Sequence, residues 1–222
     1  MPRWARWAVL AVLVAVLGVA VVVAGRPDEP LPVTGVQRLG PEADEPVADY
    51  LRRAGASLLA TEPGSVWALV QLEGYLTAEG AAELVQGVRL SRVVLRVPLP
   101  RVQTALIIRD LPGQRPVAEL TDALRSAAQD RAAVAARERP GSRSATVAAA
   151  EATQLRSGCA CVLALLVFGD SEALHAVAAR PGVRAVHAAL PDTPIQDVAI
   201  SPLLPEQVDT AGPVPDDGPV PS

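Results

Sequence analysis

Residues 66–74 read VWALVQLEG, and residues 161–169 read CVLALLVFG. The two apolar runs coincide when the chain is laid against itself with an offset of 95 positions, and each ends at a glycine. A short helix-like segment follows each run, at residues 77–86 and 171–180, and Gly-Val-Arg then opens a further apolar segment. Strand, helix and strand in this order make a βαβ unit. The sequence therefore predicts two such units, at about residues 66–97 and 159–190; the alternative is chance similarity between two segments rich in Ala and Val.

Paired βαβ units predict the α+β class and, within it, a ferredoxin-like split βαβ sandwich with its helices on one face of an antiparallel sheet. Cys161 to Phe168 is apolar at every position, which is typical of a central strand covered on both faces. Between the units lie a further strand, residues 103–109, and an insertion of two Ala-rich helices at about residues 116–156. We expect this helical hairpin to cover the face that the helices of the βαβ units leave open.

The two ends of the chain differ in composition from this middle part. Residues 26–46 alternate proline with acidic residues, which predicts a tether without a packed core. Residues 191–222 form a second Pro-rich, acidic segment, and we expect its last dozen residues to be disordered. The folded domain is therefore expected to span residues 47–190, which is enough chain to bury a core.

Residues 7–25 form an uncharged apolar run directly after Arg3 and Arg6. A helix of this length measures about 28 Å, close to the hydrocarbon thickness of a bilayer, so we predict one transmembrane helix. The positive flank predicts that residues 1–6 stay in the cytoplasm and that the remainder is exported from the plasma membrane. The alternative is a cleaved secretory signal, although the apolar run is long for one.

Cys159 and Cys161 are the two cysteines of the chain. On a regular strand their Cα atoms would lie about 6.6 Å apart, at the outer edge of disulfide geometry. Three alternatives remain open from the sequence: two buried thiols, a local disulfide in an oxidising compartment, or a pair with redox or metal chemistry. A metal site would need further ligands, and the two histidines, His175 and His187, are expected to be ordinary surface or sheet residues.

Arg89, Arg92, Arg96 and Arg101 give residues 89–101 a local excess of positive charge. Arg92 and Arg96 would share one face of a strand. The face could protect an edge strand from pairing, bind an anionic envelope polymer or a protein partner, or be covered by the acidic residues at either end of the chain.

Catalysis is not predicted, since no local motif of catalytic residues, phosphate-binding loop or metal-ligand spacing occurs in the sequence. We accordingly expect no catalytic, cofactor or metal residues and no cofactor. The net charge of −4 and the predicted export also argue against binding of nucleic acid.

Three short segments, residues 96–104 (RVPLPRVQT), 159–162 (CACV) and 201–206 (SPLLPE), together with the N-terminal span, resemble uncharacterised single-span membrane proteins of actinobacteria. The resemblance implies a setting in the bacterial cell envelope and no particular activity. We therefore expect a non-enzymatic, membrane-anchored protein whose exported domain binds or scaffolds another component. The alternative is a thiol-disulfide or metal-handling protein that uses Cys159 and Cys161.

Overall fold

The computed structural model of the chain describes residues 35–61 and 64–221. The predicted transmembrane segment, residues 7–25, lies outside these ranges. Within them, no helix has the length and apolar character needed to cross a lipid bilayer. The contacts of the chain divide it after Val36, and all the helices and strands described belong to the second unit, which starts at Gln37.

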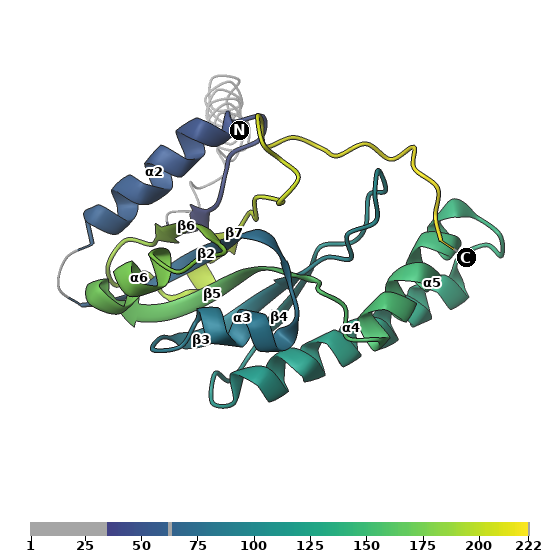
Figure 1. The fold of residues 1–222 in the computed structure, drawn as a ribbon, viewed down its shortest axis with the longest axis horizontal. Coiled ribbons are helices and arrows are strands. Elements are labelled where there is room, and N and C mark those ends of the chain that lie inside the picture. The colour runs from purple at the N-terminus through teal and green to yellow at the C-terminus, as the bar shows by residue number, and fades with distance from the viewer. Residues whose placement is uncertain (1–34, 62–63, 222) are drawn as a thin grey trace, which may run out of the picture. The chain divides into compact units, whose positions relative to one another are not determined.

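A five-stranded antiparallel sheet forms the centre of this unit (Figure 1). Its strands, in the order in which they neighbour one another, are β4 (Ile107–Asp110), β3 (Arg89–Leu95), β5 (Val162–Asp170), β2 (Ser65–Leu76) and β6 (Val183–Ala188). In the central pair, Val66 lies opposite Gly169 and Leu69 opposite Leu166. The uninterrupted apolar strand β5 is therefore the middle strand, as its sequence predicts.

Four helices connect these strands. α3 (Ala78–Leu84) follows β2, α6 (Ser171–Ala178) follows β5, and the insertion between β4 and β5 forms α4 (Pro116–Arg137) and α5 (Arg143–Arg156). Side chains of Thr77, Ser142 and Asp170 accept backbone hydrogen bonds at the starts of α3, α5 and α6, which fixes where these helices begin. The mixed α+β class predicted from the sequence is confirmed.

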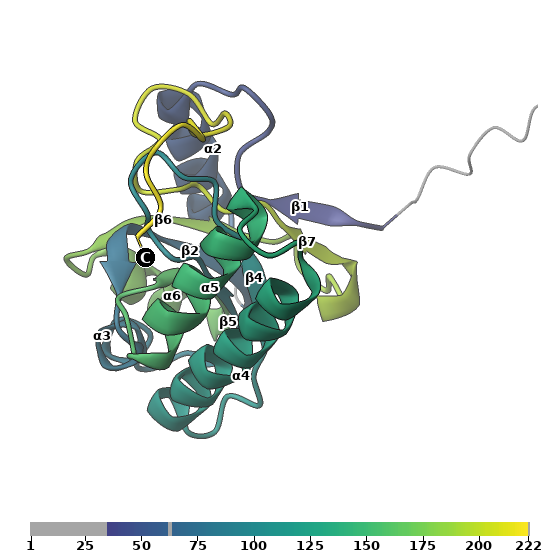
Figure 2. The ribbon, with the colours of Figure 1, turned by 90° about the vertical axis from the view of Figure 1, so that its right-hand side faces the viewer.

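All four of these helices cover the same face of the sheet. Leu120 and Leu124 of α4 and Leu155 of α5 belong to the same buried core as Ala81 of α3 and Leu174 of α6. Figure 2 shows α4 and α5 side by side. Our expectation that the helical hairpin covers the opposite face was therefore wrong: the apolar face of α4 packs beside α3 and extends the existing helical layer.

The opposite face is covered by the two ends of the chain. Trp67, Leu69 and Leu166 of the sheet pack there with Leu39 and Val198. Leu39 belongs to β1 (Gln37–Leu39), which pairs in parallel with β7 (Val198–Ile200), directly after the 3₁₀ turn Ile195–Asp197. Residues 37–46, predicted to be part of a tether, are thus partly built into the domain, because they and the C-terminal segment supply each other's hydrogen bonds.

One further helix, α2 (Val47–Leu59), packs along the edge strand β6. Tyr50 and Ala54 are fully buried there, in a small cluster with Leu203. Beyond Leu203 the chain continues over the surface to a position beside α5 (Figures 1 and 2). Hydrogen bonds hold it as far as Gly218, so the end of the tail differs from the disordered segment that we expected.

Candidate functional site

A cavity of about 880 Å³ lies between the loop that follows β3 and the C-terminal tail. Residues 98–102 form one wall and residues 205–215 form the other. Prolines dominate both walls: Pro98, Pro100, Pro205, Pro213 and Pro215. Because proline restricts the backbone and offers no N–H donor, these walls are stiff and mainly apolar.

Among the polar residues that line the cavity, Tyr75, Arg96 and Glu206 are connected to one another, and they come from three different segments of the chain. The guanidinium of Arg96 donates to the hydroxyl oxygen of Tyr75 at 2.5 Å and forms an ion pair with the carboxylate of Glu206. The Tyr75 hydroxyl donates in turn to Glu206 Oε2 at 2.9 Å. A second guanidinium nitrogen of Arg96 donates to the carbonyl of Val102 at 3.2 Å, which also fixes the loop wall.

Burial makes this group of three side chains energetically significant. Arg96 is 3 % exposed, whereas Glu206 is 38 % exposed and faces the cavity. A buried arginine needs a carboxylate partner, because an isolated charge loses much more hydration than it regains from the protein. Desolvation by burial is also the main cause that raises the pKa of Tyr75, so its phenol remains a neutral hydrogen-bonding group.

The backbone around the cavity is positioned by the sheet. Arg96 extends β3 by one residue, since its N–H donates to the carbonyl of Cys161 at 2.9 Å. On the tail side, the buried amide of Gln71 accepts from Leu203 N at 3.1 Å and donates to the Tyr50 hydroxyl at 3.1 Å. This buried link holds the tail three residues before Glu206.

The four arginines considered as a possible anion-binding or partner-binding face do not form one open surface. Arg92 pairs with Asp110 and also donates to the carbonyl of Val198, at 3.1 Å. Arg96 pairs with Glu206, as described above, and Arg101 pairs with Asp217. Of the three alternatives that the sequence leaves open, coverage by the acidic tail is the one that the structure contains for Arg96 and Arg101.

The fourth arginine of this set, Arg89, is exposed, and its guanidinium lies about 5 Å from the ring centres of Trp67 and Phe168. Cation–π contacts of this kind leave the positive charge accessible to solvent. Arg89 therefore contacts aromatic rings, whereas Arg92, Arg96 and Arg101 pair with carboxylates.

The two cysteines form a disulfide bond, which is one of the three alternatives that the sequence leaves open. Their Cα atoms lie 5.3 Å apart, closer than on a regular strand, because the chain bends before β5 begins at Val162. Cys161 is fully buried and Cys159 is partly buried. Over the described ranges, no cluster of three or more Cys, His, Asp or Glu side chains is arranged to hold a metal ion.

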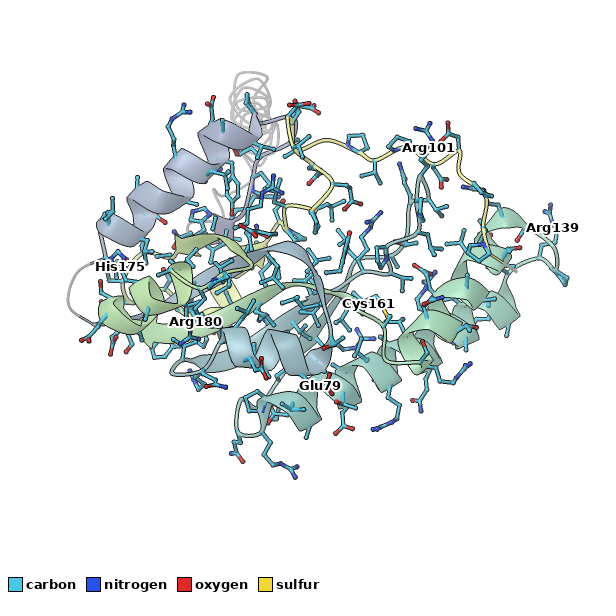
Figure 3. The ribbon with its side chains drawn as sticks, viewed as in Figure 1. Glu79, Arg101, Arg139, Cys161, His175 and Arg180 are labelled. Atoms are coloured by element: carbon cyan, nitrogen blue, oxygen red, sulfur yellow. A yellow bond between two sulfur atoms is a disulfide. The ribbon has the colours of Figure 1, made fainter. Side chains whose placement is uncertain are left out.

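His187 is more than an ordinary sheet residue. It is 5 % exposed, and its Nδ1 accepts from the backbone N–H of Gly40 at 3.0 Å. Desolvation by burial, together with the nearby charge of Arg53, lowers the pKa of His187 to about 4. His175, in contrast, is exposed on α6, as expected for a surface histidine (Figure 3).

Several residues of the site could not be singled out in the sequence. Tyr75 and Glu206 belong to no motif, and they meet Arg96 only because β2, β3 and the tail converge. The available signal was complementary charge: a basic segment near the middle of the chain and an acidic, Pro-rich end.

Comparisons of the chain with models of protein families, with curated proteins and with solved structures found no match. The fold and the geometry of the cavity are therefore the basis for any assignment of function.

Proposed function

We propose that the protein is a non-enzymatic binding or scaffolding protein of the bacterial cell envelope, and that the cavity beneath the tail is its binding site. The observation that carries this proposal is the combination of stiff proline walls with one connected polar group, Tyr75–Arg96–Glu206, in which Arg96 is buried. Binding sites commonly combine an apolar enclosure with a few fixed polar groups that orient the ligand.

The charges that line the cavity do not favour an anionic polymer, because Asp44, Glu206 and Asp209 line it together with Arg96 and Arg101. The charge of Arg96 is balanced by Glu206, and that of Arg101 by Asp217, so an anionic polymer would have to displace two carboxylates. An extended protein segment could instead place apolar side chains between the prolines and share hydrogen bonds with Tyr75 and Glu206. We therefore assign an envelope protein, rather than a polymer, as the ligand of the cavity.

The envelope setting rests on the sequence. Residues 7–25 would anchor the protein in the plasma membrane with the domain outside, in agreement with the resemblance to single-span actinobacterial proteins. The disulfide between Cys159 and Cys161 supports an oxidising location outside the cytoplasm.

For the fold, we infer a ferredoxin-like split βαβ sandwich with an added strand and helical hairpin. The supporting observation is the strand order β3-β5-β2-β6, in which the first strand of each βαβ unit lies between the outer strands and all neighbours are antiparallel. β4, α4 and α5 are additions to this arrangement.

Site-specific photo-crosslinking in intact cells tests the proposed function. Val208 lines the cavity and is 69 % exposed, and Leu59, at the end of α2, is 79 % exposed and serves as the control position. A crosslinking residue at position 208 should give one discrete protein adduct that is absent at position 59 and reduced by Tyr75→Phe. Equal adducts from the two positions, or none from position 208, would contradict a binding role for the cavity.

Protease added to sealed protoplasts tests the location separately, because an exported domain should be digested and a cytoplasmic one protected.

The second candidate function is thiol-disulfide or metal handling, and the disulfide with its partly buried Cys159 is the observation in its favour. Mass spectrometry of the native protein, alkylated before and after mild reduction, distinguishes the two functions. A bond that opens readily and forms again with a dithiol substrate would support redox exchange. A disulfide that is reduced only after the protein unfolds would be a structural crosslink and would contradict redox exchange.

A further inference from the structure

The last part of the tail, residues 213–221, lies in a site of its own, which is adjacent to the cavity. We call this the tail-binding site and define it by Pro100, Arg101, Gln103 and Arg143. Figure 3 shows Arg101 at the tip of the loop after β3, next to the tail. Arg143 is the first residue of α5, so two separate elements hold the same short segment.

Two consecutive acidic residues of the tail are each recognised by a different arginine. The guanidinium of Arg101 makes a two-point contact with the carboxylate of Asp217, with Nε at 2.7 Å from Oδ1. Arg143 donates to Asp216 Oδ1 at 3.0 Å. Hydrogen bonds from these arginines are the main cause that lowers the pKa of each carboxyl group.

The backbone of the tail is recognised as well. The side-chain amide of Gln103 donates to the carbonyl of Val214 at 2.7 Å, while its backbone N–H adds a 2.9 Å hydrogen bond to the side-chain Oδ1 of Asp216. Gly218 donates to the carbonyl of Arg101 at 2.7 Å and accepts from Arg143 at 3.0 Å. These contacts fix an extended backbone in one register.

Position 218 also selects glycine. A Cβ atom there would lie 2.3 Å from the carbonyl oxygen of Pro100, and the residue itself is buried. The site therefore recognises the short sequence Asp-Asp-Gly. Two arginines pair with the two aspartates, and the close approach of the Pro100 carbonyl admits only glycine at the third position.

The attachment is nevertheless suited to release. The ion pairs Arg101–Asp217 and Arg143–Asp216 are about half exposed on both sides, and exposed pairs of this kind are weak individually and screened by salt. Among residues 213–221, Val214 and Val220 pack in part against the hydrophobic core, and both remain partly exposed. The tail can leave without exposing much apolar surface.

We propose that the tail-binding site is a recognition site for extended acidic peptides of the Asp-Asp-Gly type, which the chain's own tail occupies until an acidic segment of a partner replaces it. Pro213, Val214 and Pro215 also line the cavity, so displacement of the tail changes part of one cavity wall. The proposal rests on the binding role proposed above and adds the chemistry of the partner: an acidic segment that is followed by glycine.

Binding of a labelled peptide with the sequence of residues 212–222 to the full-length protein in detergent, measured by fluorescence anisotropy, tests this proposal. In the wild type the attached tail competes at an effective concentration on the order of millimolar, so micromolar peptide should bind poorly. Asp217→Arg places like charges together at Arg101, displaces the tail, and should tighten apparent binding by about tenfold or more. The peptide with both aspartates replaced by asparagine should not bind.

Glu83→Arg is the control, because Glu83 is exposed on α3, lines neither the cavity nor the tail-binding site, and forms no ion pair with the described residues. This variant should behave as the wild type. Adding Arg143→Gln to Asp217→Arg should remove most of the gained binding. Gly218→Ala, which displaces the tail by a steric contact, provides a second variant that leaves both arginines and both aspartates in place.

The proposal is wrong if neither Asp217→Arg nor Gly218→Ala binds the peptide better than the wild type, or if the asparagine peptide binds equally well. This assay uses purified components, so its failure is distinguishable from a failure to crosslink a partner at position 208. Peptide binding without a crosslinked partner would contradict the cavity as a binding site and leave the tail-binding site intact.

Discussion

The Nδ1 atom of His187, on β6, accepts a 3.0 Å hydrogen bond from the backbone N–H of Gly40, directly after β1. The bond requires an unprotonated Nδ1, and it joins the N-terminal segment to the edge of the main sheet. Glu45 and Arg53 form an ion pair nearby, and Arg53 also donates to the carbonyl of Gly40 at 3.2 Å. One titratable side chain therefore contributes to the attachment of residues 37–46.

Acid should weaken the domain through His187. Its pKa is lowered from 6.5 to about 4 in the folded protein, so between these pH values the unfolded chain binds more protons. The free energy of unfolding is therefore fully retained above about pH 6.5 and falls as the pH decreases towards 4, by up to about 3 kcal/mol. Denaturant unfolding of His187→Gln should lose this part of the pH dependence. The exposed His175→Gln is the control, and an unchanged slope in His187→Gln would contradict the assignment.

A methyl group at Gly40 should separate the N-terminal segment from β7. Gly40 has φ +124°, and a Cβ atom there would lie 1.6 Å from the carbonyl oxygen of Ser201. We expect Gly40→Ala to lower the free energy of unfolding by more than about 3 kcal/mol, since both the positive φ and the contact with Ser201 oppose a side chain. Gly55→Ala, in α2, meets nothing within 4 Å and should stabilise the protein by about 0.5–1 kcal/mol. Equal effects in thermal unfolding would be inconsistent with the close approach of Gly40 and Ser201.

Removal of Glu206 should leave the Arg96 charge buried without its partner. We expect Glu206→Ala to lower the free energy of unfolding by about 2–3 kcal/mol, and Tyr75→Phe by about 1 kcal/mol. Replacing both Arg96 and Glu206 by methionine removes the unpaired charge and should cost less than Glu206→Ala alone. Glu83→Ala, at an exposed position on α3, is the control and should stay within about 0.5 kcal/mol. If the double variant lost as much free energy of unfolding as Arg96→Met and Glu206→Met lose in total, the two side chains would not interact.

Reduction of the disulfide should have a small effect on stability. Cys159 and Cys161 close a very short loop, so the bond restricts the unfolded chain little and contributes at most about 1.5 kcal/mol. Thermal unfolding with and without reductant, combined with titration of free thiols, measures this contribution. The variant with both cysteines changed to alanine should show no response to reductant. A loss of several kcal/mol on reduction would indicate that the bond holds the start of β5 in place.

The sequence was informative where a single element carries its own pattern. The apolar run of β5 predicts a central strand, and the matching segments around β2 and β5 predict the two strand–helix–strand units. The α+β class follows from these elements. The short spacing of the cysteines left a disulfide as one of three alternatives, and the bend before Val162 brings the two Cα atoms within bonding range.

The layer assignment failed because an apolar strand reports that both faces are covered, but not by which segments. β1 and β7 have three residues each, too few to show a period, and their partners are at opposite ends of the sequence. The helical hairpin was therefore assigned to a face that the chain ends cover. Tyr75 and Glu206 were missed for the same reason: they are distant from Arg96 in the sequence and meet it only in the folded domain.

The parallel pair β1–β7 makes the covering of the sheet depend on residues that the ribosome adds late. Until Val198 to Leu204 have been synthesised, β1 has no partner strand, and the cover of Trp67, Leu69 and Leu166 is incomplete. A chain that stops earlier would retain its helical layer and present an apolar surface, which is the property that chaperones and quality-control proteases recognise. Translation that ends prematurely should therefore yield an aggregation-prone product that is rapidly degraded, rather than a smaller functional domain.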